Sequence, residues 1–142
     1  MPALKLEGNL EEPKAELFER LTGVGSHEIL IESPAHDLGM DELEVKHVQD
    51  IFLCLRDRIL DLKGDIRFEY IQVFKNQGSL AGATIPHPHL QILALPVAPT
   101  AVMGKLRRAR VLYEQYHECY YCHVLKEEKK LKARILSENY HF

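Results

Sequence analysis

The stretch AGATIPHPHLQILALP, residues 81–96, carries two histidines on either side of a proline and then a run of apolar residues. A strand over this run would place His87, His89 and Gln91 on one face, because successive side chains of a strand point to opposite faces. The apolar residues between and after them would point the other way, into a hydrophobic core. The stretch therefore predicts a half-buried strand with a polar row at its start.

A loop of small residues, QGSLAGAT at positions 77–84, precedes this strand. Backbone N–H groups in such a loop can bind an anion. A neutral imidazole can attack phosphorus when a hydrogen bond holds its other nitrogen, and a carboxamide can donate to a phosphoryl oxygen. The loop, His89 and Gln91 together indicate phosphoryl or nucleotidyl transfer through a histidine intermediate. The alternative is the solvated face of an edge strand without catalytic function.

Size and charge set limits on the class of protein. The chain has 142 residues, enough for one compact domain with a core, and its net charge of -3 gives no reason to expect nucleic acid as a partner. No segment resembles an export signal or a membrane span, so we expect a cytoplasmic protein. Two of the three cysteines form Cys119-Tyr-Tyr-Cys122. Without an export signal, this pair favours metal or redox chemistry over disulfides.

Alternating apolar residues predict further strands. HEILIES, residues 27–33, and RFEYIQVFKN, residues 67–76, both alternate, and residues 1–26 are expected to form a leader over the domain surface. The connection from Asn76 to His87 contains no helix, which favours an antiparallel pair. The last ten residues, ARILSENYHF, are expected to begin another strand.

Two helical patterns separate these strands. A helix is predicted from Asp41, with Glu44 at capping-box spacing, and Cys54 within it is expected to be a buried thiol. Its apolar stripe consists of Val48, Ile51, Phe52, Leu55, Ile59 and Leu62. A second pattern runs from Val102 to Tyr120. The order of elements predicts an α+β domain, an antiparallel sheet with flanking helices.

The run VFKNQGSLAGATIPHPHLQILALP, residues 73–96, closely resembles the active-site segment of galactose-1-phosphate uridylyltransferases, a branch of the histidine-triad superfamily. The family pattern is Phe-x-Asn-x-Gly, a small-residue loop, and His-Pro-His-x-Gln. GVGSHEILIESPAHD (23–37) and CYYCHVLKEE (119–128) also resemble segments of this family, so that the similarity covers nearly the whole chain. The resemblance implies a HIT-like fold.

The resemblance also implies an activity and the residues that carry it. The enzyme would be a nucleotidyltransferase that moves a uridylyl group between UDP-glucose and a hexose 1-phosphate. His89 would be the nucleophile that carries the group, and Gln91 would contact the transferring phosphoryl group. The phosphate and ribose region would be lined by Asn76, Gly78, Ser79 and Thr84.

Structural zinc is implied at two places. His36 and His87 match family positions that bind zinc together with a CxxC pair nearer the N-terminus, and that pair is absent here. Cys119 and Cys122 resemble a second CxxC, whose histidine partners lie further along in relatives. The alternative for this second pair is two reduced thiols in a helical turn.

The resemblance further implies how the chain is organised. Residues 1–118 would form the first repeat of a two-repeat enzyme, and residues 119–142 would begin a second, incomplete repeat. The chain would thus lack pieces at both ends. A homodimer would restore the missing contacts, because single-repeat histidine-triad proteins pair in that way.

Three other functions remain open at this point. An ADP-glucose phosphorylase would use the same His89 chemistry with phosphate as acceptor. A dinucleoside polyphosphate hydrolase would use water as acceptor. A non-catalytic nucleotide-binding domain would keep the fold and the imidazoles without turnover.

Overall fold

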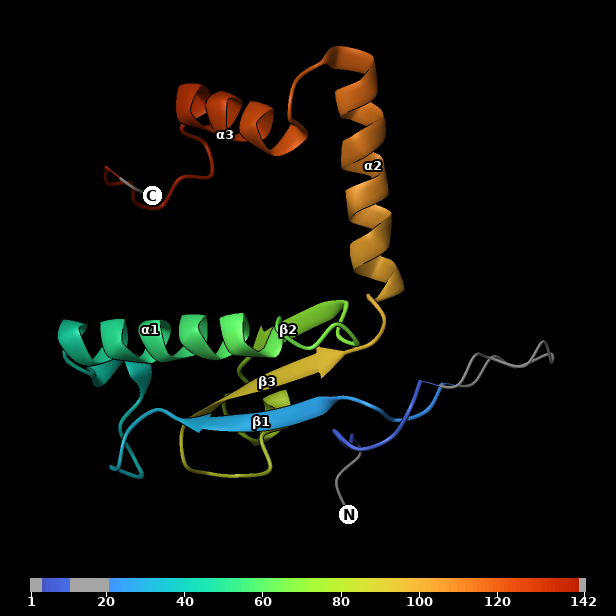
Figure 1. Cartoon of the computed structure of the whole chain (residues 1–142). Helices are drawn as coiled ribbons and strands as arrows, with labels where there is room; N and C mark the ends of the chain where they lie inside the picture. Colours follow the sequence, from blue (N-terminus) through green and yellow to red (C-terminus); the bar gives the residue numbers. More distant parts are fainter. Residues whose placement is uncertain (1–3, 11–20, 141–142) are drawn as a thin grey trace. The chain divides into compact units, whose positions relative to one another are not determined.

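The computed structural model describes residues 4–10 and 21–140, which fall into two compact units divided after Ala98. The first unit contains a three-stranded sheet and helix α1, and the second contains helices α2 and α3 (Figure 1). This differs from the one compact domain that the chain length predicts. The boundary predicted after residue 118 concerns a sequence repeat, which the compact units do not test. None of the helices in the described residues is long and apolar enough to cross a membrane.

The sheet has the strand order β1-β3-β2, with both neighbouring pairs antiparallel. Its strands are β1 (Ser26–Ile31), β2 (Tyr70–Phe74) and β3 (His89–Leu95). The antiparallel pairing predicted for the second and third of these strands is confirmed. The central position of β3 matters for the site, because the polar row at its start lies between two neighbours.

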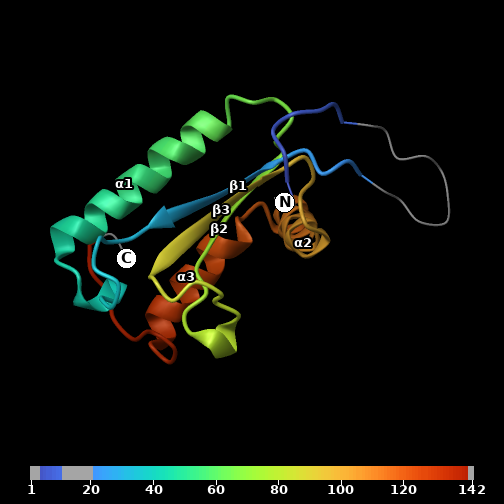
Figure 2. The ribbon, with the colours of Figure 1, turned by 90° about the horizontal axis from the view of Figure 1, so that it is seen from below.

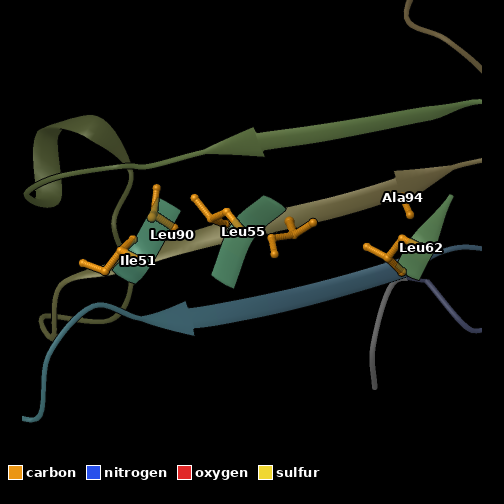
Figure 3. Packing of buried hydrophobic residues seen from close by; sticks show 6 residues of the cluster. Ile51, Leu55, Leu62, Leu90 and Ala94 are labelled. Carbon is orange, nitrogen blue, oxygen red and sulfur yellow. The ribbon is translucent and has the colours of Figure 1, made fainter. Parts of the chain in front are cut away.

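Helix α1 (Val45–Leu62) covers one face of the sheet and runs nearly along the strands (Figures 1 and 2). The helix and β3 supply the buried apolar cluster, which Figure 3 shows from close by. Its members are Ile51, Leu55 and Leu62 of α1 and Leu90, Ile92 and Ala94 of β3. The predicted burial of every second residue of β3 is therefore confirmed.

Two predictions about helix α1 are wrong, the burial of Phe52 in its apolar stripe and the burial of the Cys54 thiol. Phe52 is 58% exposed, and Cys54 is exposed as well. At about 100° per residue, Ile51, Leu55 and Leu62 point within about 40° of one another. Phe52 and Cys54 lie about 80° to either side of that direction. Both residues therefore fall outside the narrow face that contacts the sheet.

The start of the first helix also differs from the prediction at Asp41. A short 3₁₀ helix, Met40–Glu42, comes first, and α1 begins only after Glu44. The capping contact is made by Glu42, whose carboxylate accepts a hydrogen bond from Gly39 N–H at 2.8 Å. This earlier carboxylate stabilises the 3₁₀ turn, so the helix proper starts later.

The second unit contains α2 (Thr100–Tyr116) and α3 (Tyr120–Leu131) in place of the single predicted helical pattern. The break lies at His117, which has a left-handed backbone with φ of 54°. No residue of either helix is buried. The strand predicted near the C-terminus is wrong for residues 133–140, which the structure describes as bends and irregular backbone.

The predicted leader is described only in part, because residues 1–3 and 11–20 of it lie outside the described residues. Lys5 N–H donates to Gly23 O, and Gly25 N–H donates to Lys5 O, both at 2.9 Å. These bonds form a parallel bridge between Lys5 and Val24. The described start of the chain is thus tied to the segment that leads into β1.

Candidate active site

His89 and Gln91 project from the face of the sheet opposite α1. Leu90, which lies between them on β3, packs in the cluster under α1. Because side chains of a strand alternate between its two faces, His89 and Gln91 point away from the helix. Gln91 lies between Ile29 of β1 and Phe74 of β2, its partners across the two ladders. The structure therefore places both predicted catalytic residues on one face, as the alternation predicts.

The hydrogen bond of His89 decides which ring nitrogen is reactive. His89 is 4% exposed, and its Nδ1 lies 2.8 Å from the carbonyl oxygen of His87. A carbonyl oxygen can only accept, so Nδ1 carries the hydrogen and the neutral ring keeps its lone pair on Nε2. Within the described residues, the one hydrogen bond of the His89 side chain is made through Nδ1, which leaves Nε2 without a protein partner. This is the arrangement that a histidine nucleophile needs.

His36 and His87 form a second imidazole pair at the start of the same segment. His87 Nε2 donates to Ser33 O at 2.6 Å, so its Nδ1 must be the acceptor in the neutral ring. His36 Nδ1 lies 2.8 Å from that nitrogen and therefore donates to it. The pair is satisfied by hydrogen bonds alone, with the lone pair of His36 left on Nε2.

A cavity of about 560 Å³ collects the residues predicted to bind substrate. Gly78 and Gly82 have φ of 80° and 83°, which favours glycine and lets the loop turn over the cavity. His89 and Gln91 do not line the cavity. The lining ends at Pro88, the residue directly before His89. The predicted residues among its lining are Asn76, Gly78, Ser79, Thr84, His36 and His87.

Two residues that sequence reasoning missed hold this region together. The carboxylate of Glu32 is completely buried and accepts two hydrogen bonds of 2.6 Å from Lys75 Nζ, which lines the cavity. The Glu32 N–H donates to Pro88 O at 3.2 Å, and its carbonyl accepts from His47 Nε2 of α1 at 2.7 Å. Glu32 thus connects the ends of β1 and β2, the helix, and the residue before His89. An acidic residue directly after β1, in the alternating segment 27–33, was the available signal.

A third missed residue lies on the open face of the sheet. His27 of β1 has its Nε2 2.8 Å from Gln91 Oε1. No motif in the sequence singles out this histidine, because its partner is 64 residues away along the chain. The contact is nevertheless a direct one to a predicted catalytic side chain.

Structural zinc was predicted at four residues, His36, His87, Cys119 and Cys122. Within the described residues, no group of three or more His, Cys, Asp or Glu side chains is arranged to hold a metal ion. His36 and His87 supply two nitrogens, and Cys119 and Cys122 supply two sulfurs, whereas closed zinc sites take four ligands. The residues described do not complete a zinc site at either place, so structural zinc stays a prediction.

The two thiols of the CxxC pair differ in acidity. Cys119 is the N-terminal capping residue of α3. The nearby N–H and thiol of Cys122, and then the N–H of Tyr121, lower the pKa of Cys119 because they favour its thiolate. The bond to Cys119 and its charge raise the pKa of Cys122. Cys119 is therefore the thiol that ionises first.

Comparison with known proteins shows which family the chain resembles. The family described as "Galactose-1-phosphate uridyl transferase, N-terminal domain" matches residues 2–99. The chain is 34% identical to an ADP-glucose phosphorylase of Arabidopsis thaliana over 99% of its own length. It is 30% identical to a galactose-1-phosphate uridylyltransferase of Thermotoga maritima over 88% of its length. It spans 39% of the length of each of these relatives.

A solved structure supports the same grouping at the level of the fold. The structure of a uridylyltransferase aligns with 97% of this chain and 44% of its own, with a TM-score of 0.84 and 26% identity. The predicted α+β fold of the HIT-like type is thereby confirmed.

Proposed function

Because the chain belongs to the galactose-1-phosphate uridylyltransferase family, we propose that it transfers a nucleotidyl group from a nucleotide sugar through a covalent intermediate on His89. The observation that carries the proposal is the hydrogen bond from His89 Nδ1 to the His87 carbonyl. It leaves the lone pair on Nε2, on the same strand face as the carboxamide of Gln91. The named relatives act on sugar phosphates or nucleotide sugars, which supports a nucleotidyltransferase-type enzyme.

In the first step, His89 Nε2 attacks the α-phosphorus of the nucleotide sugar. The bond from that phosphorus to the bridging oxygen breaks, and the sugar 1-phosphate leaves with the electron pair. The imidazole becomes positively charged as the P–N bond forms, and the His87 carbonyl that accepts from Nδ1–H stabilises this charge. The Gln91 carboxamide donates to a non-bridging phosphoryl oxygen.

In the second step, an oxygen of an acceptor phosphate attacks the same phosphorus and Nε2 leaves. The ring returns to its neutral form with the proton still on Nδ1. The loop of Gly78 and Ser79, with Asn76 and Thr84, borders the cavity that would hold the phosphate and ribose of the nucleotide, and Pro88, the residue before His89, lines the same cavity. Lys75 also lines this cavity, but the buried Glu32 carboxylate neutralises its charge. The ion pair therefore limits the positive charge that Lys75 can offer to a bound phosphate.

Two nucleotides are candidates for the group transferred. Uridylyl transfer from UDP-glucose to a hexose 1-phosphate is the reaction that the family description supports. Adenylyl transfer from ADP-glucose to phosphate is the second candidate, and the 34% identity to an ADP-glucose phosphorylase favours it. Both reactions use the same His89 chemistry, so the mechanism does not depend on the choice.

An intact-mass spectrum of the 142-residue chain mixed with UDP-glucose or ADP-glucose tests the proposal. We expect an adduct with one of the two, and its mass identifies the nucleotide. His89→Asn is the control and should form no adduct while its circular dichroism stays that of the parent. A folded parent chain that binds nucleotide without any adduct would contradict covalent transfer and favour a non-catalytic nucleotide-binding function.

A further inference from the structure

His27 lies on the open face of the sheet, diagonally across from Gln91. Its partner across the β1–β3 ladder is Leu93, while Gln91 pairs with Ile29, two residues further along β1. Diagonal neighbours of this kind are within reach of a long side chain. The imidazole uses that reach to contact the Gln91 carboxamide, with Nε2 and Oε1 2.8 Å apart.

The chemistry of the two groups fixes the direction of this hydrogen bond. An amide oxygen can only accept, so His27 Nε2 carries a hydrogen and donates it. This holds for the neutral Nε2–H tautomer and for the imidazolium. The bond turns the oxygen of the carboxamide toward His27 on β1, so the NH₂ group points away from His27. Within the described residues, His27 is the one hydrogen-bond partner of the Gln91 side chain.

We propose that His27 is a positioning residue that orients the Gln91 carboxamide, so that its NH₂ group faces the phosphoryl oxygen of a bound nucleotide. The inference rests on the proposed function. A free carboxamide can rotate by half a turn at little steric cost, and it would then present its oxygen to an anionic oxygen. The His27 donor removes that orientation, and its loss should slow transfer roughly fivefold, the effect of one ordinary hydrogen bond.

The first test is the single-turnover rate of nucleotidylation of the full chain. His27→Phe keeps an aromatic ring without a donor and should be roughly fivefold slower. His27→Gln places an NH₂ group where Nε2–H was and should recover the parent rate. His27→Asn places it one bond short and should not. In the Gln91→Ala background, His27→Phe should have no further effect.

A matched control lies on the same face of the sheet. Tyr70 O–H donates to Gln72 Oε1 at 2.6 Å on β2, a bond of the same kind away from His89. Tyr70→Phe should therefore leave the rate unchanged. A full effect of His27→Phe in the Gln91→Ala background, or equal rates of His27→Gln and His27→Phe, would overturn the proposal.

A second measurement separates this proposal from the proposed function. In a ¹⁵N spectrum, we expect His27 as the Nε2–H tautomer and the Gln91 NH₂ resonances to shift when UMP or AMP is added. His27→Phe should abolish or weaken that shift. If no adduct forms but these shifts are seen, covalent transfer fails and the positioning role stands. If neither nucleotide shifts the Gln91 NH₂ resonances, the positioning role is overturned.

Discussion

His89 divides two tasks between its two ring nitrogens. Nδ1 donates to the His87 carbonyl, and that bond holds the ring at the start of β3. Nε2 is left with its lone pair. His89 as a residue is 4% exposed, but its Nε2 is not among the buried side-chain atoms of the described residues that lack a hydrogen-bond partner. The nitrogen with the lone pair therefore stays accessible, while the rest of the ring is buried.

Gln91, on the same strand face as His89, is the residue whose removal should reduce the rate most clearly. Gln91→Ala removes one donor to the charge that develops on the phosphoryl oxygen, and we expect transfer to slow by roughly a hundredfold. Single-turnover mass spectrometry measures this rate. Gln72→Ala, on the same face of the neighbouring strand, is the matched control and should have no such effect. Equal rates for the parent and Gln91→Ala would remove Gln91 from the mechanism.

Among the elements, the ends of β1 and β2 are joined by the Glu32–Lys75 ion pair. Burying two charges costs free energy that their attraction only partly offsets, so such a pair is weak evidence for stability by itself. The position of the ion pair suggests a structural role instead, because the Glu32 backbone is also hydrogen-bonded to Pro88 and His47. The pair fixes the strand ends on both sides of His89.

Breaking that pair on one side should be costly. Lys75→Met leaves a buried carboxylate without its partner, and we expect the free energy of unfolding to fall by about 3 kcal/mol in urea titrations. Lys46→Met removes the lysine of an exposed pair with Asp50 and should cost less than about 0.5 kcal/mol. Glu32→Gln combined with Lys75→Met should recover much of the loss. Equal losses for the two lysine variants would show that burial does not set the cost.

The pairing of α1 with β1 should make stability depend on acid pH. Bidentate hydrogen bonds of 2.6 Å from Arg58 lower the pKa of Glu28, and the Ser26 hydroxyl adds to this. A lowered folded-state pKa means that the contribution is complete above the ordinary value of 4.5 and is lost as pH falls through the folded value. Glu28→Gln should therefore be less stable than the parent at pH 7, by roughly 1 kcal/mol.

The difference should shrink as the pH is lowered below 4.5 and vanish once Glu28 is protonated in both states. Urea titrations of both proteins at several pH values measure it. A difference that stays constant down to the acid limit would mean that shape or packing, and not the charge of Glu28, causes the loss.

The sequence predicted best where local pattern and structure coincide. The alternation after His89 correctly placed Leu90 and Ile92 in the core, because a strand's period of two is decided locally. The substrate-binding residues predicted from the motif, Asn76 and Gly78 among them, line one cavity in the structure. Glu32 and His27 could not be found in this way, since their partners lie 43 and 64 residues away. Contacts at such distances depend on strand order and register, which no local pattern encodes.

At the scale of the whole molecule, the core and the candidate site belong to one unit. The six residues of the buried cluster, and the His27, His89 and Gln91 contacts, all lie before Pro99. Helices α2 and α3 contribute no buried residue of their own. The one difference in thiol acidity, at Cys119 and Cys122, belongs to the second unit.

This division predicts that residues 1–98 fold without the rest of the chain. A variant that ends at Ala98 should unfold in urea within about 1 kcal/mol of the full chain, because it keeps the whole cluster. The peptide 99–142 should show weak helical circular dichroism, since helices of 17 and 12 residues without a buried face are marginal in water. A loss of several kcal/mol in the shortened variant would contradict this and would mean that α2 and α3 stabilise the sheet.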